Sequence, residues 1–147
     1  MVLRELTALR GVSGNEAAVR DYILERIRPL ADVRIDRMGN LIAHKKGTGG
    51  ARHVVLCAHM DEVGLMVTGI DDKGYLTYDT CGGIDPRVIV SKRVLVGEKA
   101  VPGVIGAKPI HLQSKSEFES VMKHDSLVID IGAKDKADAE RQVNKGD

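Results

Sequence analysis

The stretch RHVVLCA (residues 52–58) constrains the fold most, because it contains a short apolar run that polar residues do not interrupt. Such a run is typical of a strand covered on both faces, which needs parallel neighbours and helices on both sides of its sheet. The sequence before residue 64 supplies few elements of that kind. We therefore expect either that a later, β-rich part of the chain packs across the gap, or that partner elements lie outside the chain.

Two helices are expected ahead of this run. Residues 2–10 carry leucines at helical spacing, and Gly11 ends that helix. The second helix is expected to run to about Arg28. Ser13 and Glu16 have the S-x-x-E spacing of a capping box at its start, in which the Ser13 hydroxyl accepts from the Glu16 amide and the Glu16 carboxylate reaches back.

Alternation with a period of two predicts short strands elsewhere. One hairpin is expected over 33–45, followed by a loop at 46–51, and a second hairpin over 64–79. Further short strands, separated by breaks that contain Gly or Pro, are expected at 88–90, 93–97, 103–107 and 126–132. Closely spaced strands of this length indicate a small barrel or sandwich.

The predicted fold class is therefore α/β, in two parts. Residues 1–68 form an incomplete α/β segment, and residues 69–147 form a small β-rich domain. A last helix is expected over 134–145, with Gly146 as its C-terminal cap.

Composition excludes several classes of function. The chain has 22 Lys and Arg against 21 Asp and Glu, so its net charge of +1 gives no electrostatic case for nucleic acid or an anionic membrane as the main partner. No apolar run approaches the 18 or more residues of a membrane span. Two cysteines, Cys57 and Cys81, are too few for a disulfide scaffold and favour a reducing cytoplasm.

The clearest chemical feature is AHMDEVG (58–64), at the end of the expected strand. His59 and Asp61 are two residues apart, so their side chains point to the same side of an extended chain. This pair suits a metal ligand and its orienting partner, because the carboxylate accepts the second ring N–H and fixes the tautomer. The alternative is a surface loop that simply carries a histidine and acidic residues, since H-x-D is a short and common pattern.

Six stretches in a fixed order give the chain a wider resemblance. They are GVSGNE (11–16), DRMGNLIAHKKG (36–47), AHMDEVGLMV (58–67), CGGIDP (81–86), VPGVIGAKPIHL (101–112) and LVIDIGAKDKADAE (127–140). This series resembles the N-terminal part of the M42 glutamyl aminopeptidase family of metallopeptidases, which includes the tetrahedral aminopeptidases.

The resemblance implies a cytoplasmic enzyme that removes N-terminal residues from peptides with two divalent metal ions, zinc or cobalt. It also implies a zinc-peptidase-like α/β domain, here residues 1–68, interrupted by a β-rich, PA-like insert, here residues 69–147. In such enzymes the insert serves as a dimerisation domain, and the subunits often form hollow dodecamers.

By position, His59 matches the family's first metal ligand, Asp61 the catalytic-site carboxylate that orients its imidazole, and Glu62 a neighbouring acid that is not a ligand. The other ligands and the general base of such enzymes lie C-terminal to the insert, and this chain stops at Asp147. A catalytic zinc normally keeps three protein ligands. We therefore expect the chain alone to be inactive and to bind zinc weakly or not at all.

The remaining candidates are interpreted structurally. His44, His53 and His124 have no clustered partners and are expected to be exposed, and His111 is expected to be a structural histidine. Cys57, inside the apolar run, is expected to be a small core residue.

Two other functions remain open beside that of a peptidase fragment. The chain could act only as an association module, through exposed strands around 88–107 that pair with another copy. It could also be one half of a split peptidase, whose second product completes the site.

Overall fold

The computed structural model describes residues 1–50 and 52–147, apart from the side chains of residues 117 and 118. Ala51, the last residue of the loop expected at 46–51, lies outside this description. The chain divides into two compact units, Met1–Glu62 and Val63–Asp147. The division lies slightly before Thr68, because the strand that contains Thr68 pairs with the strand that follows it.

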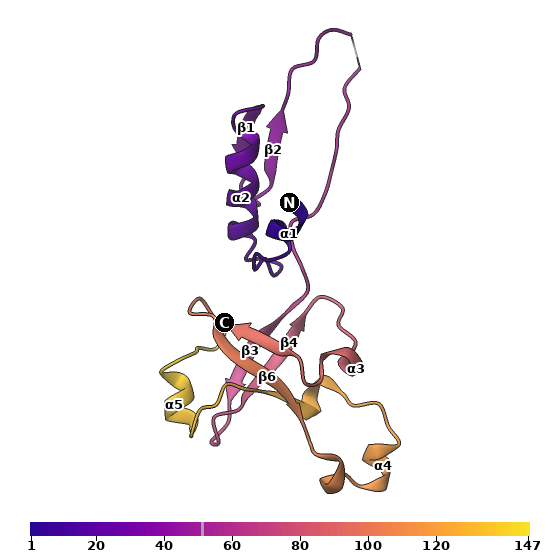
Figure 1. Cartoon of the computed structure of the whole chain (residues 1–147), viewed down its shortest axis with the longest axis vertical. Coiled ribbons are helices and arrows are strands. Elements are labelled where there is room, and N and C mark those ends of the chain that lie inside the picture. Colours follow the sequence, from indigo (N-terminus) through magenta and orange to yellow (C-terminus); the bar gives the residue numbers. More distant parts are fainter. Residues whose placement is uncertain (51) are drawn as a thin grey trace. The chain divides into compact units, whose positions relative to one another are not determined.

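The first unit holds two helices and a two-stranded antiparallel sheet (Figure 1). Helix α1 spans Val2–Leu6, so the helix expected over 2–10 is shorter than predicted. Helix α2 spans Ala17–Ile27 and buries Val19. Strands β1 (Asp32–Ile35) and β2 (Leu41–His44) pair in register, which confirms the first predicted hairpin.

A carboxylate organises the turn of this hairpin. Asp36 Oδ1 accepts the backbone N–H groups of Met38 and Asn40, both at 2.9 Å, and Oδ2 accepts the Asn40 side chain. These bonds, those from Asn40 above all, hold the pKa of Asp36 below its ordinary value. Gly39 takes φ +85°, a conformation that glycine adopts without steric cost.

The strand predicted at 52–58 is absent, and this prediction was wrong. Within the described part of this segment the backbone carries no strand assignment. Val54, Val55 and Leu56 are 85%, 78% and 94% exposed, and Cys57 is exposed rather than in a core. The physical reason is that a doubly covered strand depends on neighbouring strands, and β1–β2 is the only sheet among the described residues of this unit.

The second unit is a curled five-stranded antiparallel sheet that forms a half-barrel, with the strand order β3-β4-β7-β6-β5 (Figure 1). Its strands are β3 (Gly64–Ile70), β4 (Leu76–Cys81), β5 (Arg93–Val96), β6 (Val101–Ala107) and β7 (Leu127–Asp130). The second predicted hairpin, over 64–79, is confirmed by β3 and β4. The mixed α/β class predicted for the chain is confirmed as well.

Inward-facing side chains of this sheet build the main core. Ile105 on β6 lies opposite Ile129 on β7, and Ile129 in turn lies opposite Leu76 on β4. All three side chains are at most 2% exposed, and burial of such side chains stabilises a fold by about 1.5–3 kcal/mol each. The buried cluster comprises Val67, Leu76, Val96, Ile105, Leu127, Ile129, Ala139 and Val143.

Residues 88–90, predicted as a strand, belong instead to helix α3 (Pro86–Ile89) and the residue after it. The Asp85 carboxylate caps this helix by accepting the Arg87 N–H, and Pro86 occupies its first turn. Both features favour the start of a helix, so local capping outweighs the β-branched composition of this stretch.

The last predicted helix is also shorter than expected. Helix α5 spans Lys136–Glu140, and Gly146 does not cap it. The Gly146 N–H donates to the Val67 carbonyl, and the Val67 N–H donates to the Asp147 carbonyl, each at 2.8 Å. The end of the chain therefore runs beside the edge strand β3 and occupies part of its hydrogen-bonding edge.

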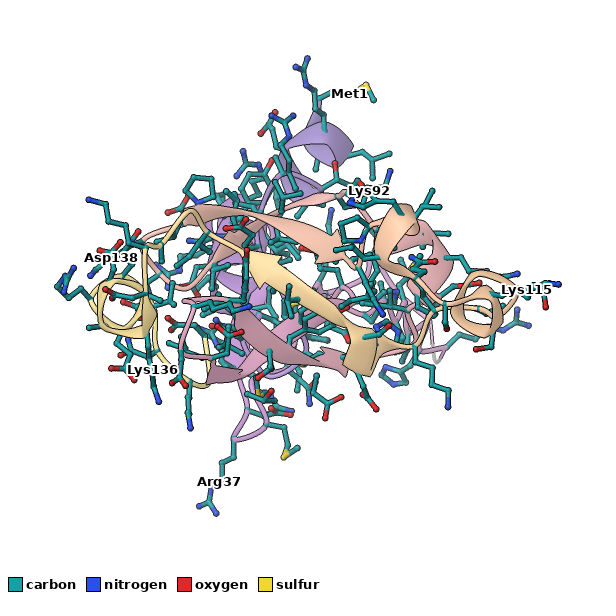
Figure 2. The ribbon with its side chains drawn as sticks, turned by 90° about the horizontal axis from the view of Figure 1, so that it is seen from below. Met1, Arg37, Lys92, Lys115, Lys136 and Asp138 are labelled. Atoms are coloured by element: carbon teal, nitrogen blue, oxygen red, sulfur yellow. The ribbon has the colours of Figure 1, made fainter. Side chains whose placement is uncertain are left out.

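Short helical turns complete the second unit. They are η1 (Ile110–Leu112), α4 (Lys115–Phe118) and η2 (His124–Ser126). Charged side chains such as Lys92, Lys115 and Lys136 come from separate segments and extend outward from the ribbon (Figure 2). Among the described residues, none of the helices has the length and apolar character needed to cross a membrane.

Candidate functional site

The loop after α1 and the end of the extended segment lie side by side in the first unit. The Glu62 N–H donates to the Gly11 carbonyl at 2.7 Å, and the Gly11 N–H donates to the Glu62 carboxylate at 3.4 Å. Val12 and Glu62 form an isolated parallel bridge. A Cβ on the buried Gly11 would come within 2.7 Å of Val19 Cγ2, so this close approach requires glycine.

The structure brings His59 and Asp61 together as their spacing predicts. Nδ1 of His59 lies 2.9 Å from the Asp61 carbonyl oxygen and 3.1 Å from Oδ1 of its carboxylate. Both oxygens can only accept, so Nδ1 carries the proton and donates to them. In the neutral ring, Nε2 then keeps its lone pair, and the side chain is 85% exposed.

A third residue, which sequence reasoning assigned elsewhere, joins this pair. The Ser13 hydroxyl donates to Oδ2 of Asp61, 48 residues away in the chain. This bond is the main reason that the pKa of Asp61 lies below its ordinary value; the bond from His59 lowers it further, and desolvation opposes both. Each oxygen of the Asp61 carboxylate therefore accepts from a different partner, Oδ1 from His59 and Oδ2 from Ser13.

The predicted capping box is therefore wrong. Glu16 is the N-cap residue of α2, and it makes no side-chain capping bond to the helix. Its carboxylate instead accepts the Gly14 N–H at 2.6 Å. Because α2 begins at Ala17, Ser13 lies three residues before the N-cap position and does not cap the helix. Its hydroxyl instead donates to the Asp61 carboxylate.

A hollow of about 190 Å³ lies beside the pair. Its wall combines apolar side chains of α1 and α2 with the His59–Glu62 segment. The lining residues are Leu6, Thr7, Leu9, Gly11, Val19, Ile23, His59, Met60, Asp61 and Glu62. The imidazole thus stands at the rim of a partly apolar hollow.

These residues do not form a complete metal centre. Among the residues that the structure describes, no three or more His, Cys, Asp or Glu side chains gather in a way that could hold a metal ion. A catalytic zinc takes three protein ligands, and a two-metal site needs still more. The described residues therefore do not fit the two-metal centre of a peptidase by themselves.

His124 is a residue whose environment sequence reasoning missed. It is half-buried rather than exposed: its Nε2–H donates to the Ile84 carbonyl at 2.9 Å, and Tyr78 Oη lies 3.3 Å from its Nδ1. The two rings meet edge to face at 6.0 Å. The partners lie about 40 residues or more before it, so no local pattern could have signalled this contact. His44, His53 and His111 are exposed.

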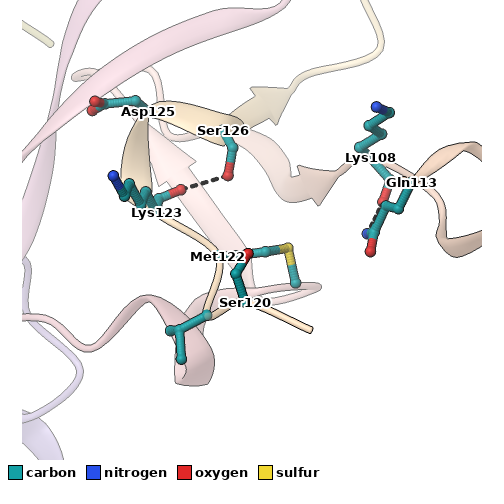
Figure 3. A pocket seen from close by; sticks show the side chains of 8 residues that line it. Lys108, Gln113, Ser120, Met122, Lys123, Asp125 and Ser126 are labelled. Atoms are coloured by element: carbon teal, nitrogen blue, oxygen red, sulfur yellow. Dashed lines mark hydrogen bonds between the residues drawn. The ribbon is translucent and has the colours of Figure 1, made fainter. Parts of the chain in front are cut away.

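A second hollow, of about 400 Å³, lies in the other unit (Figure 3). Its lining residues are Lys108, Gln113, Ser120, Val121, Met122, Lys123, Asp125 and Ser126. Two hydrogen bonds of 2.7 Å, from Gln113 to the Lys108 carbonyl and from Ser126 to the Lys123 carbonyl, hold its rim. Its ionisable lining is two lysines and one aspartate, which is not a donor set for a divalent cation.

Comparison with known proteins agrees with the resemblance seen in the sequence. The profile of the M42 glutamyl aminopeptidases matches residues 39–147. The lysyl aminopeptidase of Pyrococcus furiosus is 36% identical over 146 residues, which cover 95% of this chain and 41% of that protein.

Solved structures match equally far along the chain. A TET aminopeptidase from the marine sediment archaeon Thaumarchaeota archaeon SCGC AB-539-E09 superposes with a TM-score of 0.91 at 34% identity, covering 98% of this chain and 42% of that one. The TET1 peptidase of Pyrococcus horikoshii, which can assemble into a tetrahedron or a large octahedral shell, gives 0.85 at 41% identity, with coverage of 99% and 44%.

This chain therefore spans about two fifths of the length of the relatives it matches. The matched profile covers most of the chain, and the solved relatives share its fold throughout. The chain belongs to the M42 glutamyl aminopeptidase family.

Proposed function

We propose that the chain is the N-terminal part of a metal-dependent aminopeptidase that removes N-terminal residues from peptides, with His59 as a ligand to one of two divalent ions, zinc or cobalt. Family membership supports the activity. The single observation that carries the ligand role is the direction of the imidazole: Nδ1 donates to Asp61, so Nε2 is the nitrogen that remains for a metal. Asp61 is the carboxylate that orients this ring.

Divalent ions in such enzymes polarise the scissile carbonyl and lower the pKa of bound water. The described residues hold one ligand, so we propose that this chain alone does not hydrolyse peptides and binds zinc weakly. The complete site then needs residues from outside Met1–Asp147, supplied by a longer protein or by the second half of a split peptidase.

We further propose that Met1–Glu62 is part of the catalytic domain and that Val63–Asp147 is the β-rich, PA-like insert through which subunits associate. Leu95 and Val104 are 58% and 43% exposed on the neighbouring strands β5 and β6. Exposed apolar side chains on an edge strand and its neighbour favour a contact with another copy. A cytoplasmic location accords with the free cysteines Cys57 and Cys81.

Zinc titration of the ¹⁵N-labelled chain tests the role of His59. We expect Zn²⁺ to shift the Nε2 resonance of His59, and we expect the His59→Gln variant to lose the most responsive site. His44→Gln is the matched control, because His44 is also exposed but is followed two residues later by Lys46 instead of a carboxylate. Equal responses of His59 and His44 would contradict the proposal.

Three further experiments test the remaining parts of the proposal. Hydrolysis of aminoacyl-nitroanilides with added zinc or cobalt should show no turnover by this chain, and metal-dependent turnover would overturn its proposed incompleteness. Co-expression with the downstream reading frame should produce activity if the peptidase is split. Light scattering at several concentrations should show association, and a strictly monomeric chain would contradict the role of the insert in subunit contacts.

A further inference from the structure

We propose that Ser13 is a positioning residue, which locks the Asp61 carboxylate and thereby sets the tautomer and direction of the His59 imidazole. The inference rests on the proposed role of His59 as a metal ligand and adds a residue to that site. It starts from one contact: the Ser13 hydroxyl donates to Oδ2 of Asp61, across 48 residues of sequence.

The loop that carries Ser13 is fastened to the segment that carries Asp61. Next to Ser13, Val12 bridges Glu62, and the Gly11 carbonyl accepts the Glu62 N–H at 2.7 Å. These backbone contacts fix the separation of the two segments. The backbone contacts of the neighbouring residues thus place Ser13 within hydrogen-bonding distance of Asp61.

The Asp61 carboxylate needs Ser13 as a second partner because its terminal side-chain torsion is only weakly restrained. The terminal torsion of an aspartate is broad and roughly two-fold, so one hydrogen bond leaves its carboxylate free to swing. The side chain is 40% exposed, so packing alone does not restrain it. With Oδ2 held by Ser13 and Oδ1 3.1 Å from His59 Nδ1, both oxygens are occupied and the plane of the carboxylate is set.

The fixed carboxylate acts together with the Asp61 backbone carbonyl to set which ring nitrogen of His59 faces outward. Nδ1 of His59 lies against two acceptors of Asp61, at 2.9 and 3.1 Å, so it carries the proton. Nε2 is left with the lone pair that a metal requires. If the carboxylate turned away, Nδ1 would keep only the neutral Asp61 carbonyl at 2.9 Å and lose its charged acceptor, so the Nδ1–H tautomer and the ring direction would be held less strongly.

Long-range ¹H–¹⁵N spectra of the full chain, at a pH where His59 is neutral, measure this tautomer directly. We expect the wild type to be mainly Nδ1–H and the Ser13→Ala variant to lower the ratio of Nδ1–H to Nε2–H at least several-fold. Ser13→Thr keeps a hydroxyl donor and should restore the ratio. An unchanged ratio in Ser13→Ala would overturn the proposal.

Two controls separate positioning from structure. Ser13→Val and Ser13→Thr have the same branched shape and differ only in the hydroxyl, so they decide the question even if Ser13→Ala does not fold; equal tautomer ratios in the two would overturn the proposal. Glu16→Gln alters the partner assigned to Ser13 by the capping-box pattern, and the His59 ratio should not change. A change as large as that in Ser13→Ala would contradict a specific role for Ser13.

Zinc alone, as the probe, links this test to the proposed function. If His59 ligates metal, its apparent zinc affinity should fall about tenfold in Ser13→Ala, at the lower end of the range for residues that orient a ligand. If zinc leaves the resonances of wild-type His59 unchanged while the tautomer ratio still depends on Ser13, the metal role is contradicted and the positioning role is supported. If wild-type His59 does bind zinc, an affinity that is unchanged in Ser13→Ala would overturn the positioning proposal.

Discussion

The two units differ in how much of their apolar surface they bury by themselves. In Val63–Asp147 a cluster of buried residues joins all five strands of the sheet to the C-terminal segment, and Leu76 within it is 0% exposed. In Met1–Glu62, Val19 is the one buried hydrophobic side chain among those described, and Leu56 is 94% exposed. The second unit therefore has a hydrophobic core of its own. The first unit leaves apolar side chains exposed, and only elements outside the unit could bury them.

The largest effect on stability is expected from a substitution in the centre of the second unit's core. Leu76→Ala should lower the free energy of unfolding by about 2–5 kcal/mol, because it removes a fully buried side chain and leaves a cavity. Leu56→Ala should change it by no more than about 0.5 kcal/mol, because Leu56 already contacts solvent. Urea denaturation, followed through the amide signals of the second unit, measures both. A similar loss in the two variants would contradict a self-sufficient core.

A smaller effect is expected where the backbone of β6 approaches β7. A Cβ on Gly103 would lie 2.8 Å from Ile129 Cγ2 and 3.2 Å from Ile131 Cγ2. Gly103→Ala should therefore destabilise the second unit by about 1–3 kcal/mol through overpacking. Gly83→Ala is the matched control, since no atom lies within 4 Å of a Cβ built there. Equal denaturation midpoints for the two variants would show that β6 and β7 can separate without cost.

The predictability of the two units from sequence differs for a related reason. Hairpins such as β3–β4 follow from alternation and turn residues that lie close together in the chain, so they were predicted. The short distance between the His59 and Asp61 side chains was also predictable, because these residues are two apart in the sequence. The strand at 52–58 was not correctly predicted, because an apolar run becomes a strand only when neighbours pair with it. Composition alone cannot show whether those neighbours are present.

The predictions for two side chains, Ser13 and His124, were wrong for the same physical reason. Ser13 has a capping-box partner three residues away, yet its hydroxyl donates to a carboxylate 48 residues away. His124 has no clustered partner in the sequence, yet it contacts Tyr78 and the Ile84 carbonyl. Local spacing identifies which hydrogen bonds are available to a side chain. The fold decides which of them forms, so residues that join distant segments are missed.

The His124 contact offers a further, weaker test of the second unit. Tyr78→Phe removes the hydroxyl that lies 3.3 Å from His124 Nδ1 and should cost about 0.5–1.5 kcal/mol of unfolding free energy. His124 keeps its bond to the Ile84 carbonyl, so the fold should persist. Denaturation midpoints of the variant and the wild type check this expectation. An unchanged midpoint would show that the hydroxyl bonds equally well to water.

The smallest effect concerns the cap of α3 and its dependence on pH. The Arg87 guanidinium and backbone N–H donate to Asp85 and lower the pKa of its carboxyl from 3.8 to about 2. Because this pKa is lower in the folded chain than in the unfolded one, the contribution of Asp85 to stability is full above about pH 4. It is lost as the pH falls through about 2.

Carboxyl ¹³C titration should therefore place the Asp85 midpoint near 2, and Arg87→Gln should raise it toward 3.8. Arg141→Gln is the control, because Arg141 pairs with Asp138 and should leave the Asp85 titration unchanged. Since Asn is also a good N-cap, Asp85→Asn should reduce stability only slightly at neutral pH, and that difference should shrink at low pH. A midpoint near 3.8 in the wild type would mean that solvent separates this exposed pair, and that Pro86 and backbone geometry suffice to start α3.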